Sequence, residues 1–337
     1  MEKAVEKMRV SFLGAGAWGS TMGIMLSREG HDVRLWEINQ ARVTKLRYTR
    51  RLPGVLPGAR IPSQLHYTSD IEEALAEADL LVLAVPCQAL KATLKRLPRG
   101  YEPPRMVVSL IKGLERRTGF RPSQTWAGFF PRRPASVLSG PSIAIEVLGG
   151  HPTALVAAGE DKEAVKMIQQ TFSFDNLRVY RSDDAVGVEL GGALKNVVAV
   201  ACGIAEGLGA GTNTRAALLS RGLAEITRLG EKLGAKARTF SGLAGWGDLV
   251  TTAWNPASRN HKVGLGLARG KNLEAILAEI GMVAEGVETC RIARKLGRIH
   301  GIEMPITEAT YRVLFRGANP SKEITRLLSR SLKEEVW

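Results

Sequence analysis

The first half of the chain alternates short apolar runs with longer amphipathic segments. Apolar runs of strand length cover residues 10–13, 33–36, 80–85, 106–111, 135–138, 154–157 and 177–180. Most of these runs are continuously apolar, which is typical of parallel strands that are covered on both faces. Segments with the length and composition of helices lie between them, at 40–46, 70–77 and 89–97. The pattern therefore predicts an α/β domain with a mostly parallel sheet, and the Pro and Gly density at 53–62 predicts a loop.

From about Asp184 the pattern changes to helices alone. A long apolar helix is predicted at 186–206, and further helical segments follow at 215–233, 273–280, 289–296 and 306–315. The chain has 337 residues and 45% hydrophobic side chains, which is enough for two cores. We expect an α/β domain over residues 1–184 and an all-helical domain over residues 185–337.

A glycine-rich turn follows the first apolar run. Gly14, Gly16 and Gly19 form a G-x-G-x-x-G pattern between the strand at 10–13 and a helix. In a dinucleotide-binding βαβ unit the first glycine permits a tight turn, the second lets the backbone approach a pyrophosphate, and the third lets the helix pack against the strand. The helix N-terminus then presents free N–H groups to the phosphates. The pattern predicts a nicotinamide or flavin dinucleotide site, and a plain structural turn is the alternative.

Glu37 ends the second apolar run and lies close to the position of the ribose-binding acid of such units. A carboxylate there accepts a hydrogen bond from the ribose 2′-hydroxyl, which favours NAD over NADP. A surface carboxylate is the alternative. Arg34 and Arg42 are near enough in sequence to leave a 2′-phosphate, and therefore NADP, open.

Polar residues follow the predicted ends of two strands. Lys112 comes directly after the run at 106–111, and Gly140 and Ser142 follow the run at 135–138. Open parallel sheets bind ligands in the crevice at the carboxyl ends of their strands. Lys112 is therefore a candidate functional residue, with a surface cap of the strand as the alternative.

Lys195 interrupts the long apolar helix. A buried lysine is costly unless it is paired or functional, although its stem can also carry the charge to the surface. Gly191 and Gly192 precede it in the same helix. Each costs about 1 kcal/mol relative to alanine, which indicates close packing or close approach to a ligand.

The second half contains a further polar group. Asp248 lies at the end of a glycine-rich stretch, and Ser258, Arg259 and Asn260 follow. A guanidinium fork with hydroxyl and amide donors is typical of a phosphate receptor. Spacing alone does not separate this interpretation from an ordinary helix start with Ser258 as N-cap. His261 is expected at the surface.

Charge restricts the classes of partner. The 47 Lys and Arg residues exceed the 33 Asp and Glu residues, for a net charge of +14. The basic residues are spread along the chain and form no block with interleaved aromatics, so we expect no nucleic-acid partner. A basic cleft for an anionic substrate and cofactor, with general surface charge, fits better.

The cysteines and the apolar runs indicate the compartment. Cys87, Cys202 and Cys290 are far apart and match no metal-ligand or disulfide spacing. We therefore expect no metal site and a reducing cytoplasm. No apolar run reaches transmembrane length and no signal peptide is evident, so no integral membrane segment is expected.

Taken together, these pieces resemble the bacterial-type NAD(P)-dependent glycerol-3-phosphate dehydrogenase family. The likeness runs from about Arg9 to about Leu328, and the order and spacing of its motifs are specific. The motifs are GAGAWGS at 14–20, LAVPCQ at 83–88, IKGLE at 111–115, LSGPSIAIE at 138–146, GVELGGALKNV at 187–197, TRAALLSRGLAE at 214–225, GLAGWGDL at 242–249, SRN at 258–260, VAEGVET at 283–289 and EMPIT at 303–307.

The resemblance implies a fold, a reaction and a set of site residues. The fold is an N-terminal Rossmann-like domain followed by an all-α domain. The reaction is reversible hydride transfer between NAD(P)H and dihydroxyacetone phosphate, giving sn-glycerol 3-phosphate for glycerophospholipid synthesis, and a homodimer is implied. The implied substrate contacts are Lys112, Gly140, Ser142, Asp248, Ser258, Arg259 and Asn260. The implied cofactor contacts, besides the glycine turn, Glu37 and Lys112, are Ala17, Trp18, Ala144, Arg259, Val283 and Glu285.

Three residues have catalytic roles in this hypothesis. Lys195 resembles the family's proton donor and acceptor. Lys112, if it converges on the same site, would stabilise the developing charge and depress the pKa of Lys195 by like-charge repulsion. Asp248 would orient Lys195 and hold a substrate hydroxyl.

Some positions depart from the family pattern. Ile38 stands where many members have a basic or polar residue, which with Glu37 favours NAD. Trp246 and Trp254 flank Asp248 in place of more usual residues, which leaves open how the wall of the substrate pocket is shaped. Two other functions remain: another hydroxy-acid or sugar-acid dehydrogenase of the same architecture, and a non-catalytic dinucleotide sensor.

Overall fold

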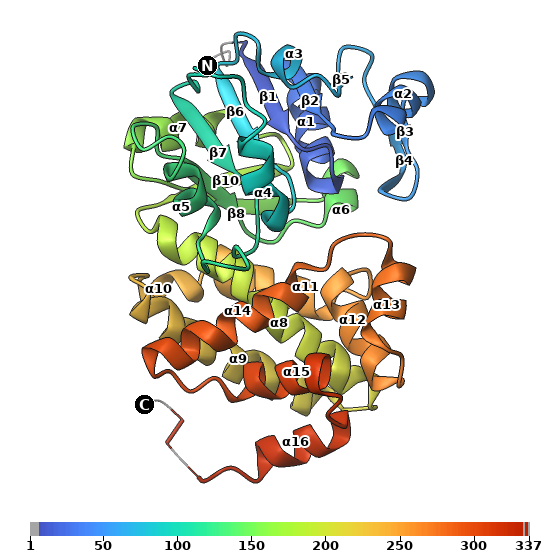
Figure 1. The fold of residues 1–337 in the computed structure, drawn as a ribbon, viewed down its shortest axis with the longest axis vertical. Helices are drawn as coiled ribbons and strands as arrows, with labels where there is room; N and C mark the ends of the chain where they lie inside the picture. Colours follow the sequence, from blue (N-terminus) through green and yellow to red (C-terminus); the bar gives the residue numbers. More distant parts are fainter. Residues whose placement is uncertain (1–6, 333, 336–337) are drawn as a thin grey trace.

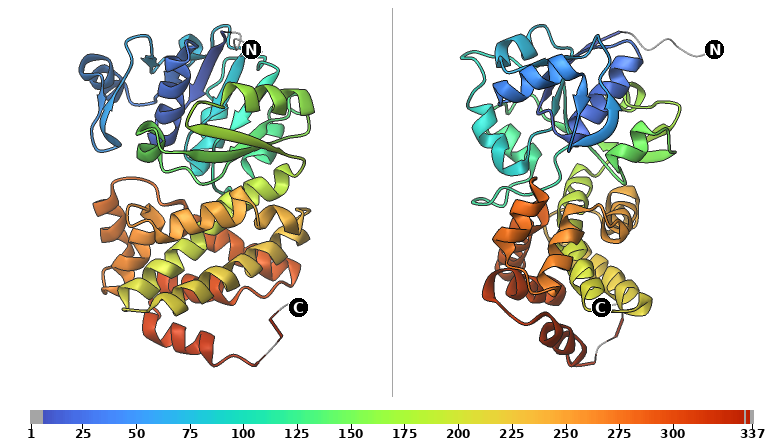
Figure 2. Two further views of the ribbon diagram at one scale, coloured as in Figure 1. Left: turned by 180° about the vertical axis from the view of Figure 1, so that it is seen from behind. Right: turned by 90° about the vertical axis from the view of Figure 1, so that its right-hand side faces the viewer.

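The computed structural model describes residues 7–332 and 334–335. An α/β body and a helical body lie one above the other (Figure 1), and the views from behind and from the side show the same stacking (Figure 2). β10 ends at Ser182 and α8 begins at Ala185, so the chain passes from one body to the other around Asp184. The carboxylate of Asp184 caps α8 by accepting a 2.9 Å hydrogen bond from the N–H of Gly187.

The α/β body is built on an eight-stranded sheet of order β10-β9-β8-β7-β6-β1-β2-β5. All pairs are parallel except β8 with β9. The strands are β1 Arg9–Leu13, β2 Asp32–Trp36, β5 His66–Thr68, β6 Leu80–Leu83, β7 Met106–Ser109, β8 Ser136–Ser139, β9 Thr153–Ala158 and β10 Leu177–Ser182. Every residue of β6, β7 and β8 is buried, because helices cover both faces of the sheet. All seven predicted strands are confirmed, and so is the mostly parallel sheet.

The helices of this body include several that the pattern did not predict. The helices that the pattern predicted are α1 Ala17–Arg28, α2 Gln40–Thr49, α3 Ile71–Leu75 and α4 Cys87–Leu94. Those that it did not predict are α5 Pro122–Ala127, α6 Ala144–Leu148 and α7 Lys162–Thr171. The prediction of a plain loop at 53–62 was wrong in part, because β3 (Arg51–Leu52) and β4 (Leu56–Arg60) form a small hairpin there. Leu52 and Leu56 are buried in the core and hold that hairpin in place.

The helical body surrounds α8. Its elements are α8 Ala185–Gly207, α9 Thr212–Lys232, α10 Ala237–Phe240, the π-helical η1 Leu243–Gly247, α11 Asp248–Trp254, α12 Arg259–Ala268, α13 Leu273–Ile280, α14 Glu285–His300, α15 Pro305–Arg316 and α16 Pro320–Leu328. By length and composition α8 could cross a membrane, so the prediction that no apolar run is long enough was too strict. The apolar stretch of α8 is entirely buried inside the protein, as expected of a core helix.

Candidate active site

The edge of the sheet that faces the helical body carries the first part of the site. Lys112 comes three residues after β7, and Gly140 comes directly after the neighbouring strand β8. α8 passes close to both: a Cβ atom on Gly192 would lie 2.7 Å from Ser139 Oγ and 3.5 Å from Lys112 Cγ. The close packing expected of this glycine is therefore confirmed. It brings Lys195, about one helical turn further along α8, to the same place as Lys112.

Asp248 joins the two lysines. Lys112 Nζ donates to Asp248 Oδ2 at 2.7 Å, and Lys195 Nζ donates to Asp248 Oδ1 at 2.5 Å. Lys112 Nζ also donates to Gly140 O at 2.8 Å and to Ser142 Oγ at 3.1 Å. One carboxylate therefore bridges two ammonium groups that come from the sheet edge and from the central helix.

This cluster is shielded from solvent. Asp248 is 2% exposed and Lys195 is 4% exposed. Burial lowers the pKa of Lys195 to about 8; the carboxylate of Asp248 opposes this shift, and the charge of Lys112 adds to it. Lys195 can therefore both hold and release a proton close to neutral pH, which a general acid and base requires.

Thr252 is a partner of Lys195 that the sequence reasoning missed. Lys195 Nζ also donates to Thr252 Oγ1. Thr252 lies four residues after Asp248 on α11, and residues with that spacing share a helix face. Helical spacing was the signal that could have found it. The glycine-rich turn before Asp248 is the π-helical segment η1, a conformation found frequently at functional sites.

Ser258, Arg259 and Asn260 do not act alike in the structure. Ser258 caps α12 by accepting from the N–H of His261, so the N-cap interpretation is confirmed. Asn260 is buried between its neighbours, where its Nδ2 donates to Asn196 Oδ1 at 2.8 Å and its Oδ1 accepts from Gly286 N at 2.9 Å. Arg259 has an exposed side chain, and its Nη1 donates to Val283 O at 2.7 Å. Their role as a phosphate receptor stays a prediction.

His261 is not at the surface, so that expectation was wrong. The side chain is 1% exposed, and its Nε2 lies 3.4 Å from Glu206 Oε2. The physical reason is the close crossing of α8 and α12. A Cβ atom on Gly203 would lie 2.1 Å from His261 O, so the two helix backbones nearly touch and bury what lies between them.

The glycine turn between β1 and α1 has the shape that a dinucleotide requires. Gly14 has φ +117°, and a Cβ atom there would lie 2.7 Å from the backbone of Ala84. A Cβ atom on Gly19 would lie 2.6 Å from Gly14 O, whereas one on Gly16 would meet nothing within 4 Å. Gly14 and Gly19 are therefore required by close packing, whereas the space beside Gly16 is open.

The start of α1 also offers hydrogen-bond donors that suit a pyrophosphate. Gly16 is the N-cap of the helix, and among the described residues no side chain bonds the N–H groups of its first turn. The unpaired N–H groups and the positive end of the helix dipole favour an anion there. Ala17 and Trp18 belong to this turn, so both border the space beside Gly16.

Glu37 is held close to this turn by Arg42. Glu37 is 8% exposed, and its Oε2 lies 2.5 Å from Arg42 Nη1. Arg42 Nη2 also donates to Ala15 O at 2.8 Å, inside the glycine turn. The alternative of an ordinary surface carboxylate was therefore wrong. Ile38, beside Glu37, is 59% exposed. The guanidinium of Arg42 could pair with a 2′-phosphate, so NADP remains an alternative cofactor.

The helical body reaches this region through the start of α14. Glu285 Oε1 accepts from Cys87 N at the start of α4 at 2.9 Å, so the two bodies are joined here. Burial raises the pKa of Glu285, and its Oε2 is buried without a hydrogen-bond partner in the part of the chain that the structure describes. Val283 is exposed just before α14, and Ala144 begins α6 in the α/β body. Trp246 and Trp254 are 38% and 41% exposed.

Comparison with known proteins gives a consistent result. Models of the NAD-dependent glycerol-3-phosphate dehydrogenase N-terminus and C-terminus match residues 9–165 and 184–325. A glycerol-3-phosphate dehydrogenase (NAD(P)+) of Carboxydothermus hydrogenoformans is 45% identical over 98% of both chains. The protein of that name from Geobacter sulfurreducens is 46% identical over 98% of this chain and 99% of its own.

Solved structures agree with these relatives. The crystal structure of glycerol-3-phosphate dehydrogenase from Coxiella burnetii superposes with a TM-score of 0.93 at 34% identity, over 96% of this chain and 99% of that one. D-mandelate dehydrogenase has a TM-score of 0.65 at 14% identity, which shows a shared fold alone. On these matches, the chain belongs to the NAD(P)-dependent glycerol-3-phosphate dehydrogenase family.

Proposed function

We propose that this enzyme reduces dihydroxyacetone phosphate to sn-glycerol 3-phosphate, reversibly, with Lys195 as the proton donor and NAD as the preferred cofactor. The observation that carries the assignment of roles is the cluster of Lys112, Asp248 and Lys195, at the same edge of the parallel sheet as the open glycine turn. The product feeds glycerophospholipid synthesis.

The cofactor would be held from several sides. The N–H groups of α1 beside Gly16 would bind the pyrophosphate, and Glu37 would bind the ribose. Further contacts would come from the residues that the resemblance to the family implies: Ala17, Trp18, Lys112, Ala144, Arg259, Val283 and Glu285. The bound dinucleotide supplies the hydride that reduces the C2 carbonyl carbon.

The residues of the cluster would handle charge and proton at the carbonyl oxygen. As negative charge gathers on that oxygen, Lys195 Nζ donates a proton to it, and in the reverse direction Lys195 accepts the proton. Lys112 stabilises the same oxygen electrostatically. Asp248 keeps the two ammonium groups together and accepts from a substrate hydroxyl.

The phosphate of the substrate would be bound at the start of α12. Arg259 has an exposed guanidinium that can make a bidentate contact, and Ser258 and Asn260 would add donors. Ser142 and Gly140 lie against Lys112 and would contact the other end of the substrate.

We further propose a division into domains over residues 1–184 and 185–337, a homodimer and a cytoplasmic location. The end of β10 at Ser182 and the start of α8 at Ala185 support the division. The three free, buried cysteines suit a reducing compartment.

Steady-state oxidation of NADH, and separately of NADPH, with dihydroxyacetone phosphate tests the proposal. We expect turnover with both cofactors and a higher kcat/KM with NADH. Dihydroxyacetone without phosphate is the control, and it should react far more slowly because Arg259 then has no anion to bind. Tight NADH binding without turnover would contradict the reaction, and a higher kcat/KM with NADPH would contradict the role of Glu37.

A further inference from the structure

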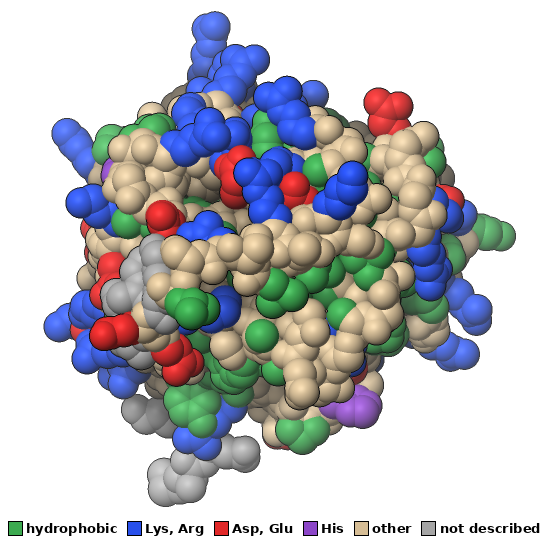
Figure 3. All heavy atoms as spheres, turned by 90° about the horizontal axis from the view of Figure 1, so that it is seen from below, with side chains coloured by type: hydrophobic (Ala, Val, Ile, Leu, Met, Phe, Trp, Pro, Cys, Tyr) green, Lys and Arg blue, Asp and Glu red, His purple; other side chains and the backbone are tan. Residues whose placement is uncertain are grey.

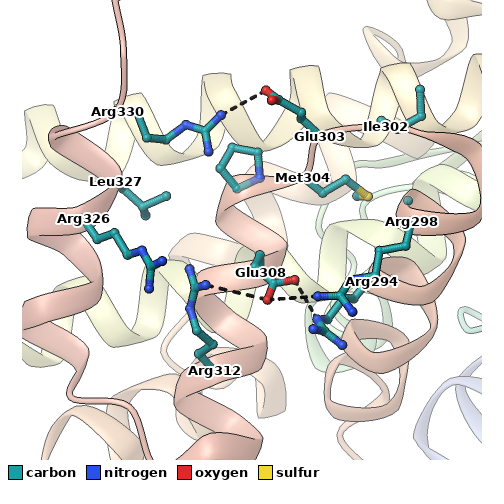
Figure 4. A pocket seen from close by; sticks show the side chains of 12 residues that line it. Arg294, Arg298, Ile302, Glu303, Met304, Glu308, Arg312, Arg326, Leu327 and Arg330 are labelled. Atoms are coloured by element: carbon teal, nitrogen blue, oxygen red, sulfur yellow. Dashed lines mark hydrogen bonds and ion pairs between the residues drawn. The ribbon is translucent and has the colours of Figure 1, made fainter.

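A second basic pocket lies in the helical body, away from the site described above. It has a volume of about 270 Å³ and opens between α14, α15 and α16 (Figure 4). The end of the molecule farthest from the sheet shows more lysine and arginine than acidic side chains (Figure 3). None of the residues that line this pocket belongs to the proposed catalytic, substrate or cofactor contacts.

Arginines dominate the pocket wall. Five arginines and two glutamates line it, and Glu323, which is not in the lining, pairs with Arg312 at 3.0 Å, so two positive charges remain in excess. The arginines are Arg294 and Arg298 from α14, Arg312 from α15, and Arg326 and Arg330 from the end of the chain's last helix and the segment after it. Figure 4 shows their side chains directed toward a shared space, with Glu308 among them.

The carboxylates present do not engage all of these guanidinium groups closely. Glu308 is 2.6 Å from Arg294, and Glu303 is 3.0 Å from Arg330. Arg298 is 3.9 Å from Glu308, and its side chain is 66% exposed.

Arg326 is paired as weakly as Arg298. It lies 4.0 Å from Glu323, and its side chain is 64% exposed. Each guanidinium has five N–H donors. Arg298 and Arg326 therefore keep most of their donors available to a ligand.

The size and chemistry of the pocket limit what it can hold. Planar guanidinium forks from different helices match the oxygens of a phosphate group, which they bind in a bidentate manner. The volume lies just below the range of about 300–1,000 Å³ that is typical of small-molecule sites. A phosphate ester group or a diphosphate fits this space, and a whole dinucleotide does not.

The pocket is also distant from the proposed cofactor site. α14 begins at Glu285, one of the proposed cofactor contacts, and Arg298 lies 13 residues further along the same helix. At 1.5 Å per residue this is about 20 Å along the helix axis. We propose that the pocket is a second anion site that binds the phosphate group of a small soluble ester or diphosphate, or of an acidic lipid head group.

The test uses a pair of charge-matched double variants of the full-length enzyme. Arg298→Glu/Arg326→Glu reverses two exposed charges in the pocket. Arg99→Glu/Arg132→Glu reverses two exposed arginines of the α/β body and serves as the control. All four side chains are exposed, so both variants should fold, and equal Tm values would verify this.

Two probes distinguish the sources of the phosphate group. Pyrophosphate binding is measured by calorimetry at fixed ionic strength, and its competition with NADH in turnover gives the active-site contribution separately. Vesicles of phosphatidylcholine with about one third phosphatidic acid are used in a flotation assay.

With at least one probe, we expect the wild type and the control to bind at least tenfold more tightly than the pocket variant. A loss confined to pyrophosphate identifies a soluble ligand, and a loss confined to vesicles identifies a lipid head group. Equal binding of all three proteins to both probes would overturn the proposal.

Discussion

The lowered pKa of Lys195 predicts opposite pH dependences for the two directions of the reaction. Burial lowers that pKa to about 8, well below the ordinary value of a lysine. Ketone reduction needs the protonated ammonium, so its rate should fall as the pH rises through 8. Alcohol oxidation needs the neutral amine, so its rate should rise over the same range.

The magnitude follows from the position of the pKa. With a pKa of about 8, Lys195 is mostly protonated at pH 7 and mostly neutral at pH 9. Each pH unit changes the ratio of the two forms tenfold, so the protonated fraction falls about tenfold between these values. The rate of reduction should fall by about the same factor, because proton donation uses only that form.

The assay is kcat/KM in both directions from about pH 6 to pH 10 at constant ionic strength. Lys195→Arg is the control, because a guanidinium keeps its proton throughout this range. Its residual activity should be low and independent of pH between 7 and 9. Wild-type profiles that are flat, or that change in the same sense in both directions, would refute the assignment of Lys195.

Three further predictions each change a single residue. Asp248→Asn leaves Lys112 and Lys195 without their shared carboxylate. Because breaking such a buried ion pair costs about 3–5 kcal/mol, the free energy of unfolding in urea should fall by that order. An unchanged urea midpoint would count against the bridge. Gly16→Val fills the open space beside α1, so the Kd for NADH should rise at least about tenfold. Tm should change little, because Gly16 has a φ of −70°, which valine also adopts. Unchanged affinity would place the pyrophosphate elsewhere. Glu37→Gln removes a negative charge near the ribose, so the NADH-to-NADPH ratio of kcat/KM should fall by about tenfold, and a rise would contradict the contact.

The sheet shows which strands and pairings the apolar pattern of the sequence can predict. Continuous apolar runs predict strands well, because burial on both faces demands them. β5, with its exposed His66 and only three residues, carries too little apolar pattern to be found. The antiparallel pairing of β8 with β9 is also absent from the pattern, since periodicity records burial and not direction.

In the site, too, the sequence predicted the residues but not their contacts. Lys112, Lys195 and Asp248 stand out in the sequence because each is a charge in an apolar or glycine-rich setting. Their shared contacts join a strand end, α8 and α11, which are far apart in the chain, so only the structure could give the distances. The burial of His261 depended on how closely two helices cross, and a single residue's neighbours in sequence do not reveal that.

Chemical rescue of Lys195→Ala is the most direct test of the central claim. The variant lacks the ammonium that donates the proton, so turnover of dihydroxyacetone phosphate with NADH should fall on the order of 10²-fold or more, while NADH binding is retained. Small primary amines added to the assay should restore part of the rate, in proportion to their protonated form. Near-normal turnover without amine would contradict the account, because the proton would then come from another group.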